Sequence, residues 1–316
     1  MKRGGGHVTT AGKARARFTQ SDVRAAVAGI RGSTSFRAPL REYTSFKIGG
    51  PADVVVEPAD VEDVCLVVRQ AHARKIPLFV LGGTNLLIRD GGIRGIVVSL
   101  ARLRGIKEES GSVLYAEGGV GMPTLIGYAI RHSLAGLEWA AGIPGTVAGC
   151  VVMNAGTKLG EMKDSMKALR LVNMTGHIVD LDAAQVKFEY RRALLPRGIV
   201  VGVWLQLKQG VRSEIGRVVK DYLHYRRDTQ PLAMPSAGCV FKNPPNDSAG
   251  RLIEAVGLKG ARIGDAEVSM KHANFMVNRG QASAGDVIAL IGKVRSAIHR
   301  RTGMRLGLEL KIVGSR

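Results

Sequence analysis

The segment Ser236-Ala237-Gly238-Cys239-Val240-Phe241-Lys242, followed directly by Asn243-Pro244, places a proton donor beside groups that can bind an anion. The small residues before Cys239 predict a turn that exposes its thiol. Lys242 and Asn243 can hold a phosphate or a carboxylate. The alternative is a buried cysteine at a strand start beside an exposed lysine, since unpaired cysteine is among the most frequently buried residue types.

A second candidate site is the turn Gly82-Gly83-Thr84-Asn85-Leu86-Leu87, which follows the apolar run 77–81. That run predicts a short buried strand. The glycines allow a ligand to approach the backbone closely, and consecutive free amides can form a nest for a pyrophosphate. A plain glycine turn would look similar, and the chain lacks a full dinucleotide-binding fingerprint after this strand.

Residues 136–156 contain few bulky side chains. This composition is typical of backbone that lies against a flat, apolar, ring-shaped cofactor, with Thr146, Asn154 and backbone amides at its polar edge. Close packing of helices is the alternative.

Two further positions could bind or polarise a carboxylate. Tyr190 and Arg191 place an aromatic ring next to a guanidinium. Glu309 lies between Leu308 and Leu310 in a predicted final strand, where it is either a buried functional acid or a residue that faces solvent. Alternation along the strand favours solvent.

Strands and helices punctuated by glycine must position these residues. Asp60 is the expected N-cap of a helix whose buried face includes Cys65, and Ser283 with Asp286 forms a predicted capping box. The pattern predicts strands at 53–57, 96–100, 113–117, 199–207, 274–278 and 308–311, a hairpin of 169–173 with 177–181, and helices at 123–132, 213–227 and 249–256. Arg226 and Arg227 end the helix at 213–227 and could contact a diphosphate, although exposed helix arginines are the commoner case.

The length of 316 residues favours two domains. We expect a basic and partly disordered N-terminal extension (1–41), a first domain (42–211), a helix and linker (212–234) and a second domain (235–316). No apolar run is long enough to cross a bilayer, which predicts a cytoplasmic protein without membrane contact. The three cysteines, Cys65, Cys150 and Cys239, fit neither a disulfide framework nor a zinc cluster.

The net charge of +20 is concentrated toward the N-terminus, where residues 1–41 carry nine Lys or Arg and one Asp. Residues 1–19 are rich in glycine and poor in large apolar side chains, which predicts a frayed tail. A role in nucleic-acid binding is an alternative, but no zinc-finger spacing or aromatic RNA-binding signature follows. Phosphate-rich small ligands account for part of the charge without nucleic acid.

Taken together and in order, these motifs resemble the bacterial UDP-N-acetylenolpyruvoylglucosamine reductase family over residues 43–314. The resemblance rests on Tyr43-Thr44-Ser45-Phe46-Lys47-Ile48-Gly49-Gly50, the turn at 82–87, Ala141-Gly142-Ile143-Pro144-Gly145-Thr146, Tyr190-Arg191, residues 236–244, Lys271-His272-Ala273-Asn274-Phe275, and Glu309. It implies an α+β protein, in which an FAD-binding domain of the vanillyl-alcohol-oxidase/PCMH type precedes a smaller α+β substrate-binding domain.

The resemblance also implies the chemistry. NADPH reduces a non-covalently bound FAD, and the flavin N5 hydride then reduces UDP-N-acetyl-3-O-(1-carboxyvinyl)-glucosamine to UDP-N-acetylmuramate for peptidoglycan synthesis. Arg191 and Glu309 match the residues that bind and polarise the substrate carboxylate, and Cys239 matches the proton donor. Tyr190, Lys242 and Asn243 match the binding site of the UDP-sugar. The implied cofactor-binding residues are Gly82, Gly83, Thr84, Asn85, Leu86, Gly142, Ile143, Gly145, Thr146, Gly149, Asn154, Ala155 and Gly156. No metal, membrane or nucleic-acid partner is implied, and the oligomeric state stays open.

The chain differs from the common family pattern in two places. Cys239 replaces the usual serine, and a thiol remains able to donate a proton. Lys242 could lower the pKa of that thiol and so make it reactive toward oxidants. Only residues 208–212 stand where some relatives carry a longer insertion with a lid tyrosine, which indicates the shorter subclass.

Two other classes of protein stay open. A covalent-flavin oxidase of the same fold would carry a histidine or cysteine in an attachment motif, and no clear one is present. The second alternative, a nucleic-acid-binding protein without enzymatic activity, is supported only by the net charge.

Overall fold

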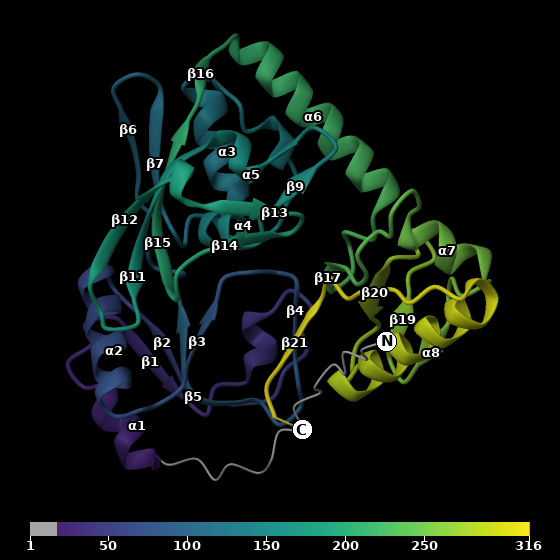
Figure 1. Ribbon diagram of the computed structural model, residues 1–316, viewed down its shortest axis with the longest axis horizontal. Helices are drawn as coiled ribbons and strands as arrows, with labels where there is room; N and C mark the ends of the chain where they lie inside the picture. The colour runs from purple at the N-terminus through teal and green to yellow at the C-terminus, as the bar shows by residue number, and fades with distance from the viewer. Residues whose placement is uncertain (1–17, 316) are drawn as a thin grey trace, which may run out of the picture.

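A computed structural model describes residues 18–315 as a larger sheet-rich domain and a smaller α+β domain, with the long helix α6 (Arg212–Thr229) between them in sequence (Figure 1). The observed elements agree closely with the expected helices and strands. No helix among the described residues combines the length and the apolar character that a membrane span needs.

The first sheet of the larger domain has the strand order β1-β2-β5-β3. Its strands are β1 (Ser33–Phe36), β2 (Ala52–Glu57), β5 (Ile93–Ser99) and β3 (Leu78–Leu81). Because β2, β5 and β3 are parallel, a crossover helix is required, and α2 (Val61–Ala73) supplies it. Asp60 caps α2 by accepting a hydrogen bond from the backbone N–H of Asp63, and Cys65 is buried as predicted. The residues of β3 are half-buried rather than buried, because Phe79 and Val80 line a cavity.

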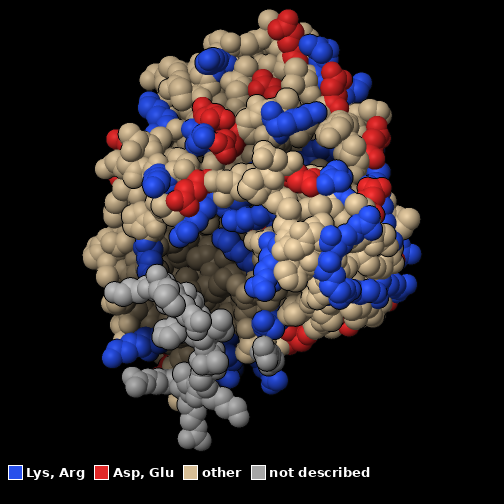
Figure 2. Space-filling view, turned by 45° about the vertical axis from the view of Figure 1, so that its right-hand side comes forward, with Lys and Arg blue, Asp and Glu red and all other residues tan. Residues whose placement is uncertain are grey.

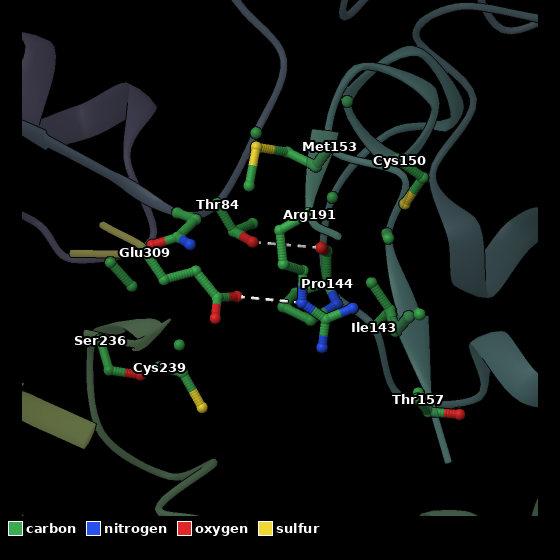
Figure 3. Close-up of a pocket in the computed structure, with 18 of the residues that line it drawn as sticks. Thr84, Ile143, Pro144, Cys150, Met153, Thr157, Arg191, Ser236, Cys239 and Glu309 are labelled. Atoms are coloured by element: carbon green, nitrogen blue, oxygen red, sulfur yellow. Dashed lines mark hydrogen bonds and ion pairs between the residues drawn. The ribbon is translucent and has the colours of Figure 1, made fainter. Parts of the chain in front are cut away.

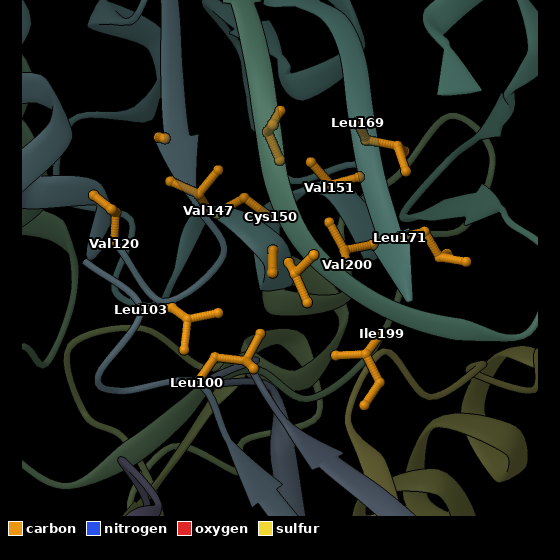
Figure 4. Packing of buried hydrophobic residues seen from close by; sticks show 14 of the residues in the cluster. Leu100, Leu103, Val120, Val147, Cys150, Val151, Leu169, Leu171, Ile199 and Val200 are labelled. Atoms are coloured by element: carbon orange, nitrogen blue, oxygen red, sulfur yellow. The ribbon is translucent and has the colours of Figure 1, made fainter. Parts of the chain in front are cut away.

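The second sheet is antiparallel, with the order β12-β11-β15-β7-β6. Its strands are β12 (Ile178–Asp182), β11 (Met166–Asn173), β15 (Gly198–Gln206), β7 (Val113–Glu117) and β6 (Ile106–Glu109). The short helix α4 (Val147–Val152) packs against β15, and Figure 4 shows Val147, Cys150 and Val151 among apolar side chains of the sheet. The helix α3 (Met122–Arg131) begins with proline in its first turn, as expected.

Residues 18–41 pack into the larger domain instead of extending from it. Val23 and Ala26 of α1 (Gln20–Ala26) belong to the main apolar core, and β1 pairs with β2 along its whole length. The expected frayed tail falls almost wholly on residues 1–17, which lie outside the described part of the chain.

The smaller domain contains one antiparallel sheet covered by two helices. The sheet has the order β17-β20-β19-β18, with β17 (Ser236–Cys239), β20 (Phe275–Asn278), β19 (Ala266–Val268) and β18 (Arg262–Ile263). The helices are α7 (Ala249–Ala255) and α8 (Ala284–Thr302), and Ser283 and Asp286 form the predicted capping box of α8.

The C-terminal segment returns to the larger domain. The last strand, β21 (Lys311–Val313), pairs in parallel with β4 (Leu86–Ile88), and Figure 1 shows the two running side by side between the domains. This strand begins later than predicted, so Glu309 precedes it. The pairing carries Glu309 toward the glycine turn that leads into β4.

Short elements complete the larger domain. They are η1 (Leu40–Tyr43), β8 (Leu134–Ala135) paired with β16 (Lys208–Gln209), η2 (Glu138–Ala140), β9 (Gly156–Thr157) paired with β10 (Gly160–Glu161), α5 (Met162–Ser165), η3 (Ala183–Gln185), and β13 (Lys187–Glu189) paired with β14 (Arg192–Leu194). Within the short segment 208–212, Lys208 and Gln209 form β16, and α6 already begins at Arg212.

Candidate active site

A cavity of about 310 Å³ lies where the glycine turn after β3, the segment before α4, α6 and β17 meet. Figure 2 shows a hollow in the surface with Lys and Arg side chains along its margin. Residues from both domains line the cavity, so neither domain forms it alone.

Two loops of the larger domain make one wall. The hydroxyl of Thr146 donates to the carbonyl of Gly82 at 3.0 Å. The hydroxyl of Thr84 donates to the carbonyl of Pro144 at 3.2 Å (Figure 3). A Cβ built on Gly149 would lie 1.9 Å from the carbonyl oxygen of Gly82, so only glycine allows the start of α4 to approach the turn this closely.

The polar groups of this wall fit a phosphate-bearing cofactor. The backbone N–H groups of Gly83, Thr84 and Asn85 have no acceptor among residues 18–315, and such consecutive free amides favour an anion. The buried Oδ1 of Asn85 has no hydrogen-bond partner in the described chain, which suits a hydroxyl group of a ligand.

A second cavity of about 230 Å³ adjoins the first and shares Gly82, Gly83, Asn85 and Gly149 with it. Its wall is largely apolar and includes Phe79, Val80, Leu100, Ile199 and Val200. An elongated cofactor with an apolar ring system at one end and phosphates near the glycine turn fits this shape. FAD has these features.

Three residues predicted to be catalytic, Arg191, Cys239 and Glu309, line the first cavity. Arg191 lies in the turn between β13 and β14 with a positive φ of 59°. Its Nε lies 3.3 Å from Oε1 of Glu309, and the two side chains are 24% and 12% exposed. In Figure 3 they face each other across the cavity, with Cys239 nearby.

The side chain of Glu309 is only 12% exposed, so the expectation from alternation, that it faces solvent, is wrong. Its backbone N–H donates to the carbonyl of Val240 at 2.9 Å, and this bond holds it beside Cys239. Burial raises the pKa of the Glu309 carboxyl, and the positive charges of Arg191 and Lys242 oppose the shift. The protonated carboxyl is therefore favoured relative to an exposed glutamate.

Cys239 ends β17, and Gly238 before it adopts a φ of 73° that favours glycine. The cysteine is partly accessible from the cavity rather than fully exposed. Burial, followed by the negative charge of Glu309, raises the pKa of its thiol to about 12, against the opposing charges of Arg191 and Arg226. The expectation that Lys242 lowers this pKa is therefore wrong, because burial of the thiol dominates.

Most of the predicted cofactor-binding residues line the first cavity, and three do not. Leu86 lines the adjoining cavity. Gly142 faces the side chain of Arg226, where a Cβ would meet Cδ at 3.0 Å. Asn154 is fully buried, and its amide bonds to the side chain of Glu161, the carbonyl of Glu189 and the N–H of Lys163.

The predicted substrate-binding residues lie outside the cavity lining. Tyr190 is 52% exposed, and the guanidinium of Arg191 lies 5.1 Å from the centre of its ring. Lys242 and Asn243 are exposed, and Oδ1 of Asn243 accepts the N–H of Ala249 at the start of α7. These side chains could contact a ligand only where it extends beyond the cavity.

The expectation that Arg226 is exposed is wrong, whereas Arg227 is exposed as expected. Arg226 lines the cavity together with Tyr222 and Gln230. A signal for this was present in the sequence, because Ile215, Val219, Tyr222 and Arg226 recur at helical spacing and share the inward face of α6.

Known proteins match this chain over most of its length. Residues 52–182 match a family model described as "FAD binding domain", and residues 230–313 match one described as "UDP-N-acetylenolpyruvoylglucosamine reductase, C-terminal domain". A UDP-N-acetylenolpyruvoylglucosamine reductase of Moorella thermoacetica is 44% identical over 90% of this chain and 95% of its own length, and one of Anaeromyxobacter is 43% identical over 90% of each. The crystal structure of the reductase from Thermus caldophilus superposes with a TM-score of 0.78 at 35% identity, over 90% of this chain and 100% of that chain. These matches confirm the predicted fold class of an FAD-binding domain followed by a smaller α+β domain.

Proposed function

Because this chain belongs to the UDP-N-acetylenolpyruvoylglucosamine reductase family of FAD-dependent oxidoreductases, we propose that it reduces UDP-N-acetyl-3-O-(1-carboxyvinyl)-glucosamine to UDP-N-acetylmuramate, with NADPH as the electron donor. The product is a precursor of peptidoglycan. The observation that carries this proposal is the Arg191–Glu309 pair beside Cys239, in a cavity whose opposite loops fit FAD.

The residues that would hold FAD are chiefly 82–85 and 143–146, whose loops are joined by two hydrogen bonds, together with Gly149. The free amides of the glycine turn suit its phosphates, and Asn85 can accept a hydrogen bond from a hydroxyl group. When bound, FAD supplies the substrate with the hydride received from NADPH.

Arg191 and Glu309 would bind the carboxylate of the enolpyruvyl group. Hydride addition to the terminal carbon pushes negative charge toward that carboxylate, and the guanidinium of Arg191, which is 24% exposed, would stabilise such charge. The raised pKa of Glu309 favours its protonated carboxyl, which can donate a hydrogen bond to a carboxylate oxygen. Only 12% of the Glu309 side chain is exposed, so its interactions are weakly screened.

Cys239 would supply the proton that completes the reduction. The S–H bond breaks, a C–H bond forms at the carbon next to the carboxylate, and the electron pair stays on sulfur. The high pKa of the thiol keeps it protonated at neutral pH and therefore ready to donate. Arg191 and Arg226 stabilise the thiolate until solvent returns its proton.

The test is an anaerobic spectrum of the purified yellow protein. NADPH should bleach the flavin absorbance, and the enolpyruvyl UDP-sugar should restore it with formation of UDP-N-acetylmuramate. A flavin that NADPH reduces but this substrate cannot reoxidise would overturn the proposal. The cytoplasmic location and the non-covalent attachment of FAD stay predictions, and release of flavin on acid precipitation checks the latter.

A further inference from the structure

Arg226 is a buried cation, and its effect on the Cys239 thiolate does not explain how its own charge is balanced. Its relative exposure is 9%, although it lies in the last turn of α6. Its Nε and Nη2 donate to Oε1 of Gln230 at 3.1 and 2.8 Å, and its Nη1 donates to the carbonyl of Ala141 at 3.3 Å. The guanidinium is therefore held in one orientation by both α6 and the segment before α4.

These partners are neutral. Burial lowers the pKa of Arg226, and the ionisable groups that oppose this shift are Tyr222 and Cys239. No carboxylate among residues 18–315 forms an ion pair with it. A buried charge without a counter-ion is costly, and proteins usually pair such charges. Arg226 lines the cavity, and one N–H on each of Nη1 and Nη2 has no partner among residues 18–315.

The neighbouring backbone makes room for this side chain. Gly142 has a φ of 71°, and a Cβ at this position would lie 3.0 Å from Cδ of Arg226 and 3.2 Å from a methyl group of Leu223. The glycine that sequence reasoning assigned to the cofactor therefore accommodates an arginine directed into the site.

From this arrangement we propose that Arg226 is an oxyanion-binding residue of the cavity, which takes a phosphate group of a bound ligand as its counter-ion. Its guanidinium can bind phosphate in two parallel hydrogen bonds, which a lysine cannot reproduce. The inference rests on the proposed function for the identity of the ligands, since FAD, NADPH and the UDP-sugar all carry phosphates.

The position of Arg226 favours the exchanging ligands over FAD. Arg226 lines the cavity together with Cys239, the residue assigned to the substrate, and its charge acts on that thiol. Arg226 also comes from the helix that leads into the substrate-binding domain. We therefore expect the UDP-sugar to be the principal source of the anion.

Three binding measurements on the intact chain separate the sources. The first is the dissociation constant of FAD from the apoprotein, the second is that of UDP from the holoenzyme followed by flavin absorbance, and the third is the NADPH concentration that half-saturates flavin reduction. Arg226→Gln removes a charge-assisted hydrogen bond to phosphate, so the affinity for one of the three ligands should fall by about 10- to 100-fold. We expect that loss for UDP, with FAD binding little changed.

Two further variants keep the test decisive. Arg227→Gln makes the same change of charge on the adjacent exposed residue and should leave all three constants unchanged. Gln230→Ala keeps the charge of Arg226 but removes the acceptor of two of its hydrogen bonds. We therefore expect a smaller loss of affinity for the same ligand, and this variant can be measured even if Arg226→Gln folds poorly. If the affinity for FAD or NADPH falls instead of that for UDP, Arg226 still binds an anion, but the ligand that supplies the phosphate is FAD or NADPH.

Equal affinities of wild type, Arg226→Gln and Gln230→Ala for all three ligands would overturn the inference. This outcome differs from failure of the proposed function, in which the holoenzyme binds these ligands but the enolpyruvyl UDP-sugar does not reoxidise its flavin.

Discussion

The Nε of Arg191 lies 3.3 Å from Oε1 of Glu309, and this contact joins two distant parts of the chain across the cavity. Arg191 belongs to a tight turn of the larger domain. Glu309 is attached to the smaller domain by the hydrogen bond from its backbone N–H to the carbonyl of Val240. The strand β21, which follows Glu309 directly, pairs with β4 of the larger domain. Formation of the site is therefore coupled to the docking of the two domains.

Replacement of Glu309 by glutamine should separate the two halves of the reaction. Glu309→Gln keeps the shape and a hydrogen-bond donor but cannot share a proton, so we expect reoxidation of the flavin by the UDP-sugar to slow by about 100-fold or more. Reduction by NADPH should stay near the wild-type rate. Stopped-flow absorbance under anaerobic conditions measures both.

A matched control is Glu267→Gln. Glu267 is similarly buried, with 14% side-chain exposure, and its Oε2 lies 3.6 Å from Nε of Arg279, yet it does not line the cavity. Unchanged reoxidation in Glu267→Gln is expected. A Glu309→Gln enzyme with a normal rate of reoxidation would remove Glu309 from the mechanism.

Substitution of Cys239 tests the proton donor. Cys239→Ser should retain substantial activity, because a hydroxyl group occupies nearly the same position and can donate a proton. Cys239→Ala should still be reduced by NADPH but should form no product. Rapid-quench analysis of UDP-N-acetylmuramate gives the readout, and Cys65→Ala, a buried cysteine on α2, serves as the control. Normal turnover by Cys239→Ala would exclude this role.

The thiol of Cys239 should resist alkylation near neutral pH. Its pKa is raised from 9.0 to about 12, so at pH 8 the thiolate fraction is on the order of a thousandfold below that of an exposed cysteine. The rate of reaction with iodoacetamide in the native holoenzyme should rise with pH through and beyond 9, and peptide mass spectrometry can assign the site. Rapid labelling of Cys239 at pH 7 would contradict the shift, and the denatured chain provides the fast reference.

The same shift predicts a loss of stability in alkali. Between pH 9 and 12 the unfolded chain releases the Cys239 proton while the native chain retains it, so fewer protons are bound in the unfolded state and the free energy of unfolding falls as pH rises. Below pH 9 both states hold the proton, and the contribution is constant. Urea titrations of wild type and Cys239→Ser across this range should show the steeper decline in the wild type.

The sequence predicted local structure well, because capping residues, glycines and apolar spacing act over short distances. Asp60 and Ser283 are examples, because each caps its helix as predicted, and residues 82–85 form a connection without helix or strand. The burial of Glu309 could not be predicted, because it depends on β21 pairing with a strand more than two hundred positions away in the chain. Alternation describes a residue inside a strand, and Glu309 precedes one.

The sequence predicted that Gly142 and Asn154 bind the cofactor, but in the structure both residues contact other parts of the protein. Gly142 makes space for Arg226, and Asn154 holds the carbonyl of Glu189 just before the Tyr190-Arg191 turn. Both support side chains of the site through contacts that only the tertiary structure reveals. The raised pKa of Cys239 has the same origin, since burial of the thiol is its largest cause, ahead of the charges of Glu309, Arg191 and Arg226.

The contact of Gly149 with Gly82 provides the last prediction. Gly149→Ala would place a methyl group 1.9 Å from a backbone carbonyl that cannot rotate away, so the start of α4 and the glycine turn must separate. We expect the dissociation constant of FAD to rise by at least about tenfold and the free energy of unfolding of the apoprotein to fall by about 1–3 kcal/mol. Gly292→Ala is the control: Gly292 lies within α8, and no side chain comes within 4 Å of the position that a Cβ would take there, so alanine should stabilise the helix by up to about 1 kcal/mol. If Gly149→Ala bound FAD as tightly as Gly292→Ala, the close approach of these two loops would not be what shapes the cofactor site.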